Sequence, residues 1–174
     1  GNVNSGAVSI SNLKMGGDIK ANNRVGGVIG YCNDKTKITI SNVSVNDGNF
    51  SMKGEKYVGG IIGEFAGESF NIDSVKLSHT VTSADSDLRS ILARGDESAY
   101  AGGVIGYISQ LSAESYVKNT LIECPVEGAK VVGGLIGYSH IASDSATLHI
   151  ENSSVASIVI GDNIAGGFVG SFDQ

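Results

Sequence analysis

Apolar and polar residues alternate over short stretches of this chain, and polar bends separate the stretches. The segments around Leu148, Val155 and Val169 are examples, each of them three to six residues long and rich in β-branched or aliphatic side chains. Alternation with a period of two predicts β-strands, because successive side chains of a strand point to opposite faces. No single segment is long enough to bury a face alone, so the strands must pack on equivalents elsewhere in the chain.

Those equivalents are visible as an internal repeat. A glycine-rich heptapeptide occurs five times, as VGGVIGY, VGGIIGE, AGGVIGY, VGGLIGY and AGGFVGS. Its fixed glycines are Gly26, Gly27, Gly30, Gly59, Gly60, Gly63, Gly102, Gly103, Gly106, Gly133, Gly134, Gly137, Gly166, Gly167 and Gly170. Repeats of this length, each with a few short strands, are typical of solenoids.

A second signature precedes each heptapeptide: an aliphatic residue, then a small polar residue two positions later. The polar residues are Asn12, Asn42, Ser74, Asn119 and Asn152. Asparagine tolerates a left-handed backbone and therefore marks a bend between two strands. We expect the four asparagines to stack their amides along a buried corner, where hydrogen bonds between repeats satisfy them.

The sequence therefore predicts an all-β protein, a parallel β-solenoid of about five coils with three short strands per coil. We expect residues 1–174 to form one solenoid domain and to be a piece of a longer chain. In the GG strand, the ladder Ile29, Ile62, Ile105, Ile136 and Val169 is predicted to face the core. The next ladder, Val28, Ile61, Val104, Leu135 and Phe168, points to the other face by alternation, so it is either covered or forms an exposed stripe.

The third repeat contains an insertion from Thr82 to Tyr100. Leu88, Ile91 and Leu92 recur at helical spacing, so we expect a short helix from about Asp87 to Arg94, with Gly95 as its C-cap. The tripeptide Arg94, Gly95 and Asp96 has the form that integrin ligands present. Either it is an interaction site on an exposed loop, or the glycine only ends the helix.

The motif of two glycines, two aliphatic residues and a glycine, preceded by Asn-x-x-Val, resembles the GLUG-motif repeats of bacterial surface and secreted proteins. Adhesins and immunoglobulin-A-specific zinc metallopeptidases carry such repeats. The resemblance covers essentially the whole chain and implies a β-solenoid that is extracellular or at the cell surface, with flanking domains in the same chain. The His-Glu-x-x-His zinc signature of those peptidases is absent from these residues.

Composition narrows the function classes. The net charge is −6 and there is no long run of Lys or Arg, which argues against nucleic acid as a partner. No apolar stretch reaches the roughly 18 to 20 residues of a membrane span. We identify no catalytic, cofactor-binding or metal-ligating residue, because His79, His140 and His149 lack ligand spacing. Cys32 and Cys124 fall about three coils apart, too far for a disulfide, so we expect free thiols.

The leading hypothesis is a non-catalytic module, a rigid spacer or an adhesion scaffold for a host protein or glycan. One alternative is an accessory region of a secreted peptidase. Another is a glycan-active β-helix enzyme, for which the column Tyr31, Tyr107 and Tyr138, interrupted by Glu64 and Ser171, is the only aromatic feature. Packing explains that column better than a sugar site, since no column of carboxylates recurs from coil to coil.

Overall fold

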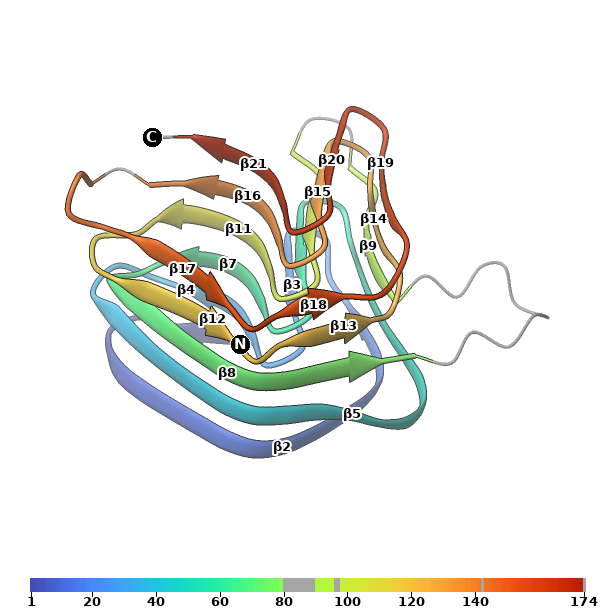
Figure 1. Cartoon of the computed structure of the whole chain (residues 1–174), viewed down its shortest axis with the longest axis horizontal. Coiled ribbons are helices and arrows are strands. Elements are labelled where there is room, and N and C mark those ends of the chain that lie inside the picture. Colours follow the sequence, from blue (N-terminus) through green and yellow to red (C-terminus); the bar gives the residue numbers. More distant parts are fainter. Residues whose placement is uncertain (80–89, 96–97, 142, 174) are drawn as a thin grey trace.

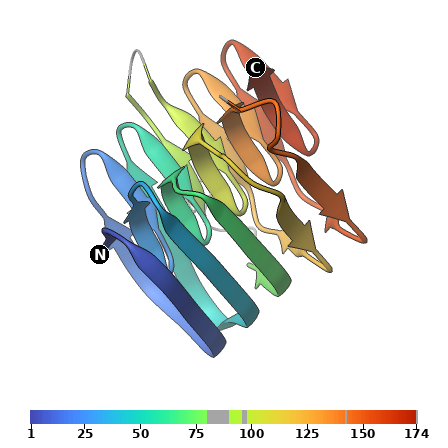
Figure 2. The same ribbon diagram turned by 90° about the vertical axis from the view of Figure 1, so that its left-hand side faces the viewer.

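The two longest strands span 6–20 and 36–54, and both begin with the alternating residues that the sequence shows. The structure is a computed structural model that describes residues 1–79, 90–95, 98–141 and 143–173. Every strand pairing is parallel, and the described residues form about five stacked coils. Figure 2 shows the coils side by side, from the first (blue) to the last (red). The prediction of an all-β parallel β-solenoid is confirmed.

The strands of successive coils have the following bounds. The chain begins with β1 (Asn2–Val3); the first two coils are β2 (Gly6–Lys20), β3 (Arg24–Gly26), β4 (Ile29–Cys32), β5 (Thr36–Gly54), β6 (Tyr57–Gly59) and β7 (Ile62–Ala66). The third is β8 (Ser69–Ser78), β9 (Ile91–Ala93), β10 (Tyr100–Gly102) and β11 (Ile105–Gln110). The fourth is β12 (Ser115–Lys118), β13 (Leu121–Glu123), β14 (Val126–Gly128), β15 (Val131–Gly133) and β16 (Ile136–His140). The fifth is β17 (Leu148–Glu151), β18 (Ser154–Val155), β19 (Val159–Gly161), β20 (Ile164–Gly166) and β21 (Val169–Asp173).

Equivalent strands build three sheets. Sheet A has the order β1-β4-β7-β11-β16-β21, and sheet C has the order β20-β15-β10-β6-β3. Sheet B holds the remaining strands and bends around the molecule (Figure 1). Sheets C and A meet at the Gly-Gly corner and diverge from it, as β20 and β21 do in Figure 1.

Two details of the prediction differ from the structure. Three strands per coil are present only in the first two coils, whereas the last two have five each, because bends interrupt the long first strand. The helix expected from about Asp87 to Arg94 is wrong over its last turn, where Ile91–Ala93 is strand β9 between β5 and β14. Pairing with both neighbours overrides the local helical spacing of its apolar residues. Residues 87–89 lie outside the described residues.

The polar bends adopt the backbone conformation that their sequence predicts. Asn12, Asn42, Ser74, Asn119 and Asn152 all have positive φ, between 47° and 58°. Asparagine and serine tolerate this left-handed region better than branched residues do, which explains their recurrence.

The expectation of a buried amide stack at this bend is wrong, because all five side chains are exposed. Hydrogen bonds nevertheless link neighbouring coils here: Asn42 Nδ2 donates to Asn12 Oδ1 at 2.6 Å, and Asn119 Nδ2 donates to Asp73 Oδ1 at 2.8 Å. The left-handed bend turns the side chains outward, so the ladder forms in solvent. The bonds from Asn119 and Ser74 lower the pKa of Asp73.

The Gly-Gly corner brings both aliphatic ladders into the core. Ile62, Ile105 and Ile136 are buried as predicted, and so are Ile61, Val104 and Leu135 from the ladder that alternation assigned to the opposite face. The chain bends where the second ladder lies, at Gly60 and Ile61 for example, after β6 has ended and before β7 begins. The bend breaks the alternation, so the second ladder is covered in the second, third and fourth coils rather than forming an exposed stripe, and only Phe168 of the last coil is exposed.

Every glycine of the motif except Gly167, in the last coil, occupies a place where a Cβ would meet backbone. A Cβ on Gly102 would collide with the Ile105 carbonyl oxygen of its own coil, and one on Gly103 with the Gly134 carbonyl oxygen of the next coil. A Cβ on Gly106 would meet Val58 N at 2.6 Å, in the previous coil. The motif therefore repeats because the coils stack backbone to backbone at this corner.

We predict that Gly103→Ala lowers the free energy of unfolding by about 3 kcal/mol, because the added methyl forces two coils apart. Gly167→Ala is the matched control, since nothing lies within 4 Å of a Cβ at this equivalent position in the last coil. Its unfolding free energy should stay within about 0.5 kcal/mol of the original chain. Urea unfolding of dilute samples measures both, and equal losses would contradict the account.

Candidate functional site

Two columns of equivalent residues face each other where sheets C and A diverge. Pairing in sheet C aligns Arg24, Tyr57, Tyr100, Val131 and Ile164. Pairing in sheet A aligns Tyr31, Glu64, Tyr107, Tyr138 and Ser171. The sheet A column is the one that the sequence predicted. The sheet C column was missed, although its residues recur two positions before the first glycine of every repeat.

Four tyrosines from these columns, Tyr57, Tyr100, Tyr107 and Tyr138, form what we call the tyrosine cluster. Ring centroids of Tyr57 and Tyr107 lie 4.8 Å apart, and those of Tyr100 and Tyr138 lie 5.0 Å apart. Tyr107 also contacts Tyr100 at 5.3 Å and Tyr138 at 5.4 Å. All four side chains are half-buried, so the cluster presents part of its aromatic surface to solvent. Such amphipathic surface is common where proteins bind partners.

An ion pair closes one end of the cluster. Arg24 Nε pairs with Glu64 Oε2, and the guanidinium lies 4.3 Å from the ring centroid of Tyr31. Glu64 Oε1 also accepts a hydrogen bond from Ser109 Oγ at 2.9 Å. Because the Glu64 side chain is only 8% exposed, these partners replace water around its charge. The carboxylate is therefore bound on both oxygens.

Burial controls proton affinity in the cluster. Desolvation, followed by the neighbouring tyrosines and Glu64, raises the pKa of Tyr107 to about 12. Desolvation also raises the pKa of Tyr57, with Glu64 as the next cause. Desolvation and a hydrogen bond to Asp173 raise the pKa of Tyr138. With their pKa values raised, Tyr57, Tyr107 and Tyr138 keep their phenol protons at physiological pH and can donate hydrogen bonds.

The Arg-Gly-Asp tripeptide is described only in part, since Asp96 lies outside the described residues. Arg94 is exposed and follows β9 directly. Gly95 N donates to the Glu55 carbonyl oxygen at 2.6 Å, and a Cβ on Gly95 would collide with that oxygen. Its φ is not positive, so the interpretation of Gly95 as a left-handed helix C-cap is wrong. The glycine instead allows close approach to the second coil.

The cysteines are free, as predicted, and both are buried. Desolvation raises the pKa of both Cys32 and Cys124 to about 12. The histidines are dispersed. His79 is buried, His140 Nδ1 lies 3.9 Å from Asp173 Oδ2, and His149 stacks on Tyr116. Within the described ranges, no three His, Cys, Asp or Glu side chains are grouped to hold a metal ion.

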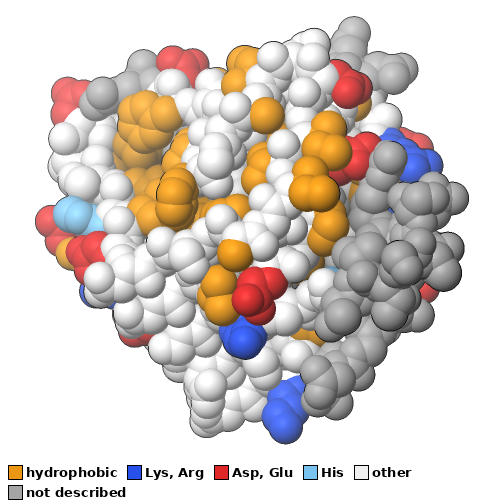
Figure 3. All heavy atoms as spheres, turned by 45° about the vertical axis from the view of Figure 1, so that its right-hand side comes forward, with side chains coloured by type: hydrophobic (Ala, Val, Ile, Leu, Met, Phe, Trp, Pro, Cys, Tyr) orange, Lys and Arg blue, Asp and Glu red, His pale blue; other side chains and the backbone are white. Residues whose placement is uncertain are grey.

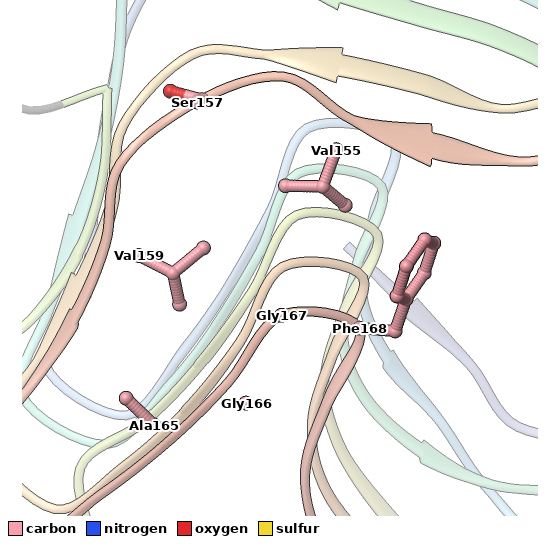
Figure 4. Close-up of a pocket in the computed structure, with 7 residues that line it drawn as sticks. All are labelled: Val155, Ser157, Val159, Ala165, Gly166, Gly167 and Phe168. Atoms are coloured by element: carbon pink, nitrogen blue, oxygen red, sulfur yellow. The ribbon is translucent and has the colours of Figure 1, made fainter.

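The interior of the last coil is open. Val155, Val159, Ala165, Gly167 and Phe168 line a hollow of about 310 Å³ there (Figure 4). Hydrophobic side chains are exposed on the face seen in Figure 3, and the large ones identified as exposed in the described structure all belong to this coil. They are Ile158, Ile160, Ile164, Phe168 and Phe172. The end of the solenoid is therefore a second candidate surface.

Comparisons with protein-family models, with curated proteins and with solved structures found no match to this chain. In the part of the chain that the structure describes, no helix has the length and apolar character needed to cross a lipid bilayer. The candidate surfaces are therefore assigned from geometry alone.

We predict that the tyrosine cluster makes stability fall at alkaline pH. Between pH 10 and about 12 the folded protein retains the Tyr107 proton, whereas the unfolded chain releases it. The stability that Tyr107 contributes is therefore complete below pH 10 and is lost as the pH rises toward 12. Unfolding of the original chain and of Tyr107→Phe, followed in urea across this range, measures the effect. The variant should lose less stability than the original chain, and parallel pH profiles would contradict the assignment.

Proposed function

We propose that this chain is a non-catalytic β-solenoid module of a bacterial surface or secreted protein, which serves as a rigid scaffold for interaction with a host protein or glycan. The supporting observation is the use of the repeat itself. The recurring glycines admit backbone from neighbouring coils, and the recurring aliphatic residues fill the core. The repeated positions therefore serve packing. A surface or extracellular location follows from the resemblance to GLUG-motif repeats.

The tyrosine cluster is the surface to which this proposal assigns binding. Its rings pack against one another, so few rotamers are lost when a partner binds. Each phenol supplies apolar area and a hydrogen-bonding group. The tripeptide Arg94, Gly95 and Asp96 is a further candidate for binding in this proposal, although Asp96 lies outside the described residues.

The enzymatic alternative receives little support from this site. Glycoside hydrolysis generally uses two carboxyl groups, one as an acid and one as a base or nucleophile. Glu64 pairs with Arg24 and Ser109 rather than with a second carboxylate. An accessory role in a secreted peptidase is compatible with the scaffold, because the catalytic centre would then lie in another domain.

The deciding experiment is a binding screen of the purified chain against immunoglobulin A, matrix proteins, integrin-bearing cells and a glycan array. We expect saturable binding to one of them that Tyr138→Ala weakens at least about tenfold. Tyr116→Ala is the matched control, because this half-buried tyrosine lies on sheet B, stacked on His149. Asp96→Ala reports on the tripeptide.

Other outcomes redirect the proposal. If the chain binds none of these ligands, the module acts as a spacer and the tyrosine cluster has no recognition function. Loss of binding in Tyr116→Ala but not in Tyr138→Ala would move the site to sheet B. Hydrolysis of a host protein or glycan that Glu64→Gln abolishes would contradict the non-catalytic assignment.

A further inference from the structure

At the boundaries between successive coils, a corner carbonyl accepts two hydrogen bonds. Ile61 O accepts from Val28 N and Ile29 N, both at 3.0 Å. Val104 O and Leu135 O repeat the arrangement, and Phe168 O accepts from Leu135 N at 2.8 Å and from Ile136 N at 3.0 Å. In the last coil the equivalent donors are the N–H groups of Phe168 and Val169. No described residue occupies the place of their acceptor.

The same place is sterically empty. The second glycine of the four preceding motifs lies against the carbonyl of the next coil's glycine, as Gly134 does against Gly167. Gly167 has nothing within 4 Å of a Cβ position. Phe168 and Phe172, which continue buried columns, are 45% and 54% exposed. The end face therefore matches one specific occupant, a parallel coil with its own Gly-Gly corner.

The first coil of this chain is such a coil. Its corner residue Val28 carries the carbonyl that would accept the two free N–H groups, and Gly27 carries the carbonyl that would fill the space at Gly167. One element stands in the way, because β1 already pairs with β4, aligning Asn2 with Tyr31 and Val3 with Cys32. In the last coil β21 holds the equivalent position, aligning Ser171 with Tyr138 and Phe172 with Ser139.

We propose that copies of this chain associate head to tail, with β21 of one copy replacing β1 on β4 of the next. The exchange favours β21 because it brings five residues and buries Phe172, whereas β1 has two residues and buries the smaller Val3. The exchange also brings the carbonyl acceptors of the next copy's first coil to the open coil and covers its apolar side chains. Because the two surfaces differ, the contact does not close on itself, and growth gives open-ended filaments. This association is independent of the proposed binding function.

Cysteine cross-linking tests the register. In the proposed contact, residue 172 of one copy lies beside Cys32 of the next, at the strand spacing of about 4.8 Å, which a disulfide can bridge. Under oxidising conditions Phe172→Cys should therefore give a ladder of covalent oligomers on a non-reducing gel. Adding Cys32→Ala should abolish the ladder. Dimers that persist in the double variant would indicate contact between two C-terminal ends and overturn the proposal.

Locking β1 provides the converse test. Val3→Cys places a thiol opposite Cys32 of the same copy, so oxidation should fix β1 on β4 and hold the protein monomeric. Reduction should restore association, seen by light scattering as a mass that rises with protein concentration. Association of the oxidised variant to the same mass would overturn the replacement of β1.

End-face variants complete the test without cysteines. Phe172→Glu and Gly167→Ala should each weaken association by at least about tenfold, the first by charge and the second by filling the space that the Gly27 carbonyl needs. Ile160→Glu is the matched control, because this exposed residue aligns with Glu127 and Leu92 on the side wall, and it should leave association unchanged. An original chain that stays monomeric at every concentration would overturn the proposal outright.

Discussion

At the Gly-Gly corner, the backbone of each coil passes too close to itself and to its neighbours to leave room for a side chain. The first glycine of a pair faces a carbonyl of its own coil, and the second faces a carbonyl of the next coil. This close approach fixes the parallel register of sheets A and C, because a slip by one residue would place a Cβ where only a hydrogen atom fits.

Register is what turns repeated residues into columns. Once the corners coincide, Tyr57 stacks beside Tyr100, and Tyr107 meets Tyr138, although 31 to 43 residues separate each pair along the chain. The same alignment places Glu64 within reach of Arg24 from the previous coil. The candidate binding surface is therefore a consequence of the glycines, and a change at the corner would disturb it without touching a tyrosine.

The sequence was sufficient where a residue type has one physical use. Repeated glycines predicted the solenoid, and repeated asparagines predicted the bends, because few residues tolerate those backbone conformations. The sequence was insufficient where pairing with neighbouring strands decides the secondary structure. The apolar spacing of Ile91 and Leu92 suits a helix, and only pairing with β5 and β14 makes it a strand.

The candidate site was half visible for the same reason. The column of Tyr31, Tyr107 and Tyr138 follows from the repeat, whereas its contact with Tyr57 and Tyr100 depends on the angle between two sheets. Asn12 and Asn42 illustrate the limit in the other direction, since their hydrogen bond was predicted but their burial was not. The repeated residues determine which side chains align in a column. The path of the chain between the corners determines whether that column meets another sheet or solvent.

Amide hydrogen exchange at the corners tests the stacking of coils most directly. The account predicts slow exchange for the N–H groups of Ile62, Ile105 and Ile136, each bonded to the carbonyl of the next coil, and fast exchange for Val169, which no described coil covers in the monomer. A gradient of this kind, read residue by residue in dilute solution, would establish the corner as the point where coils join. Fast exchange at Ile105 and Ile136 as well would contradict the account.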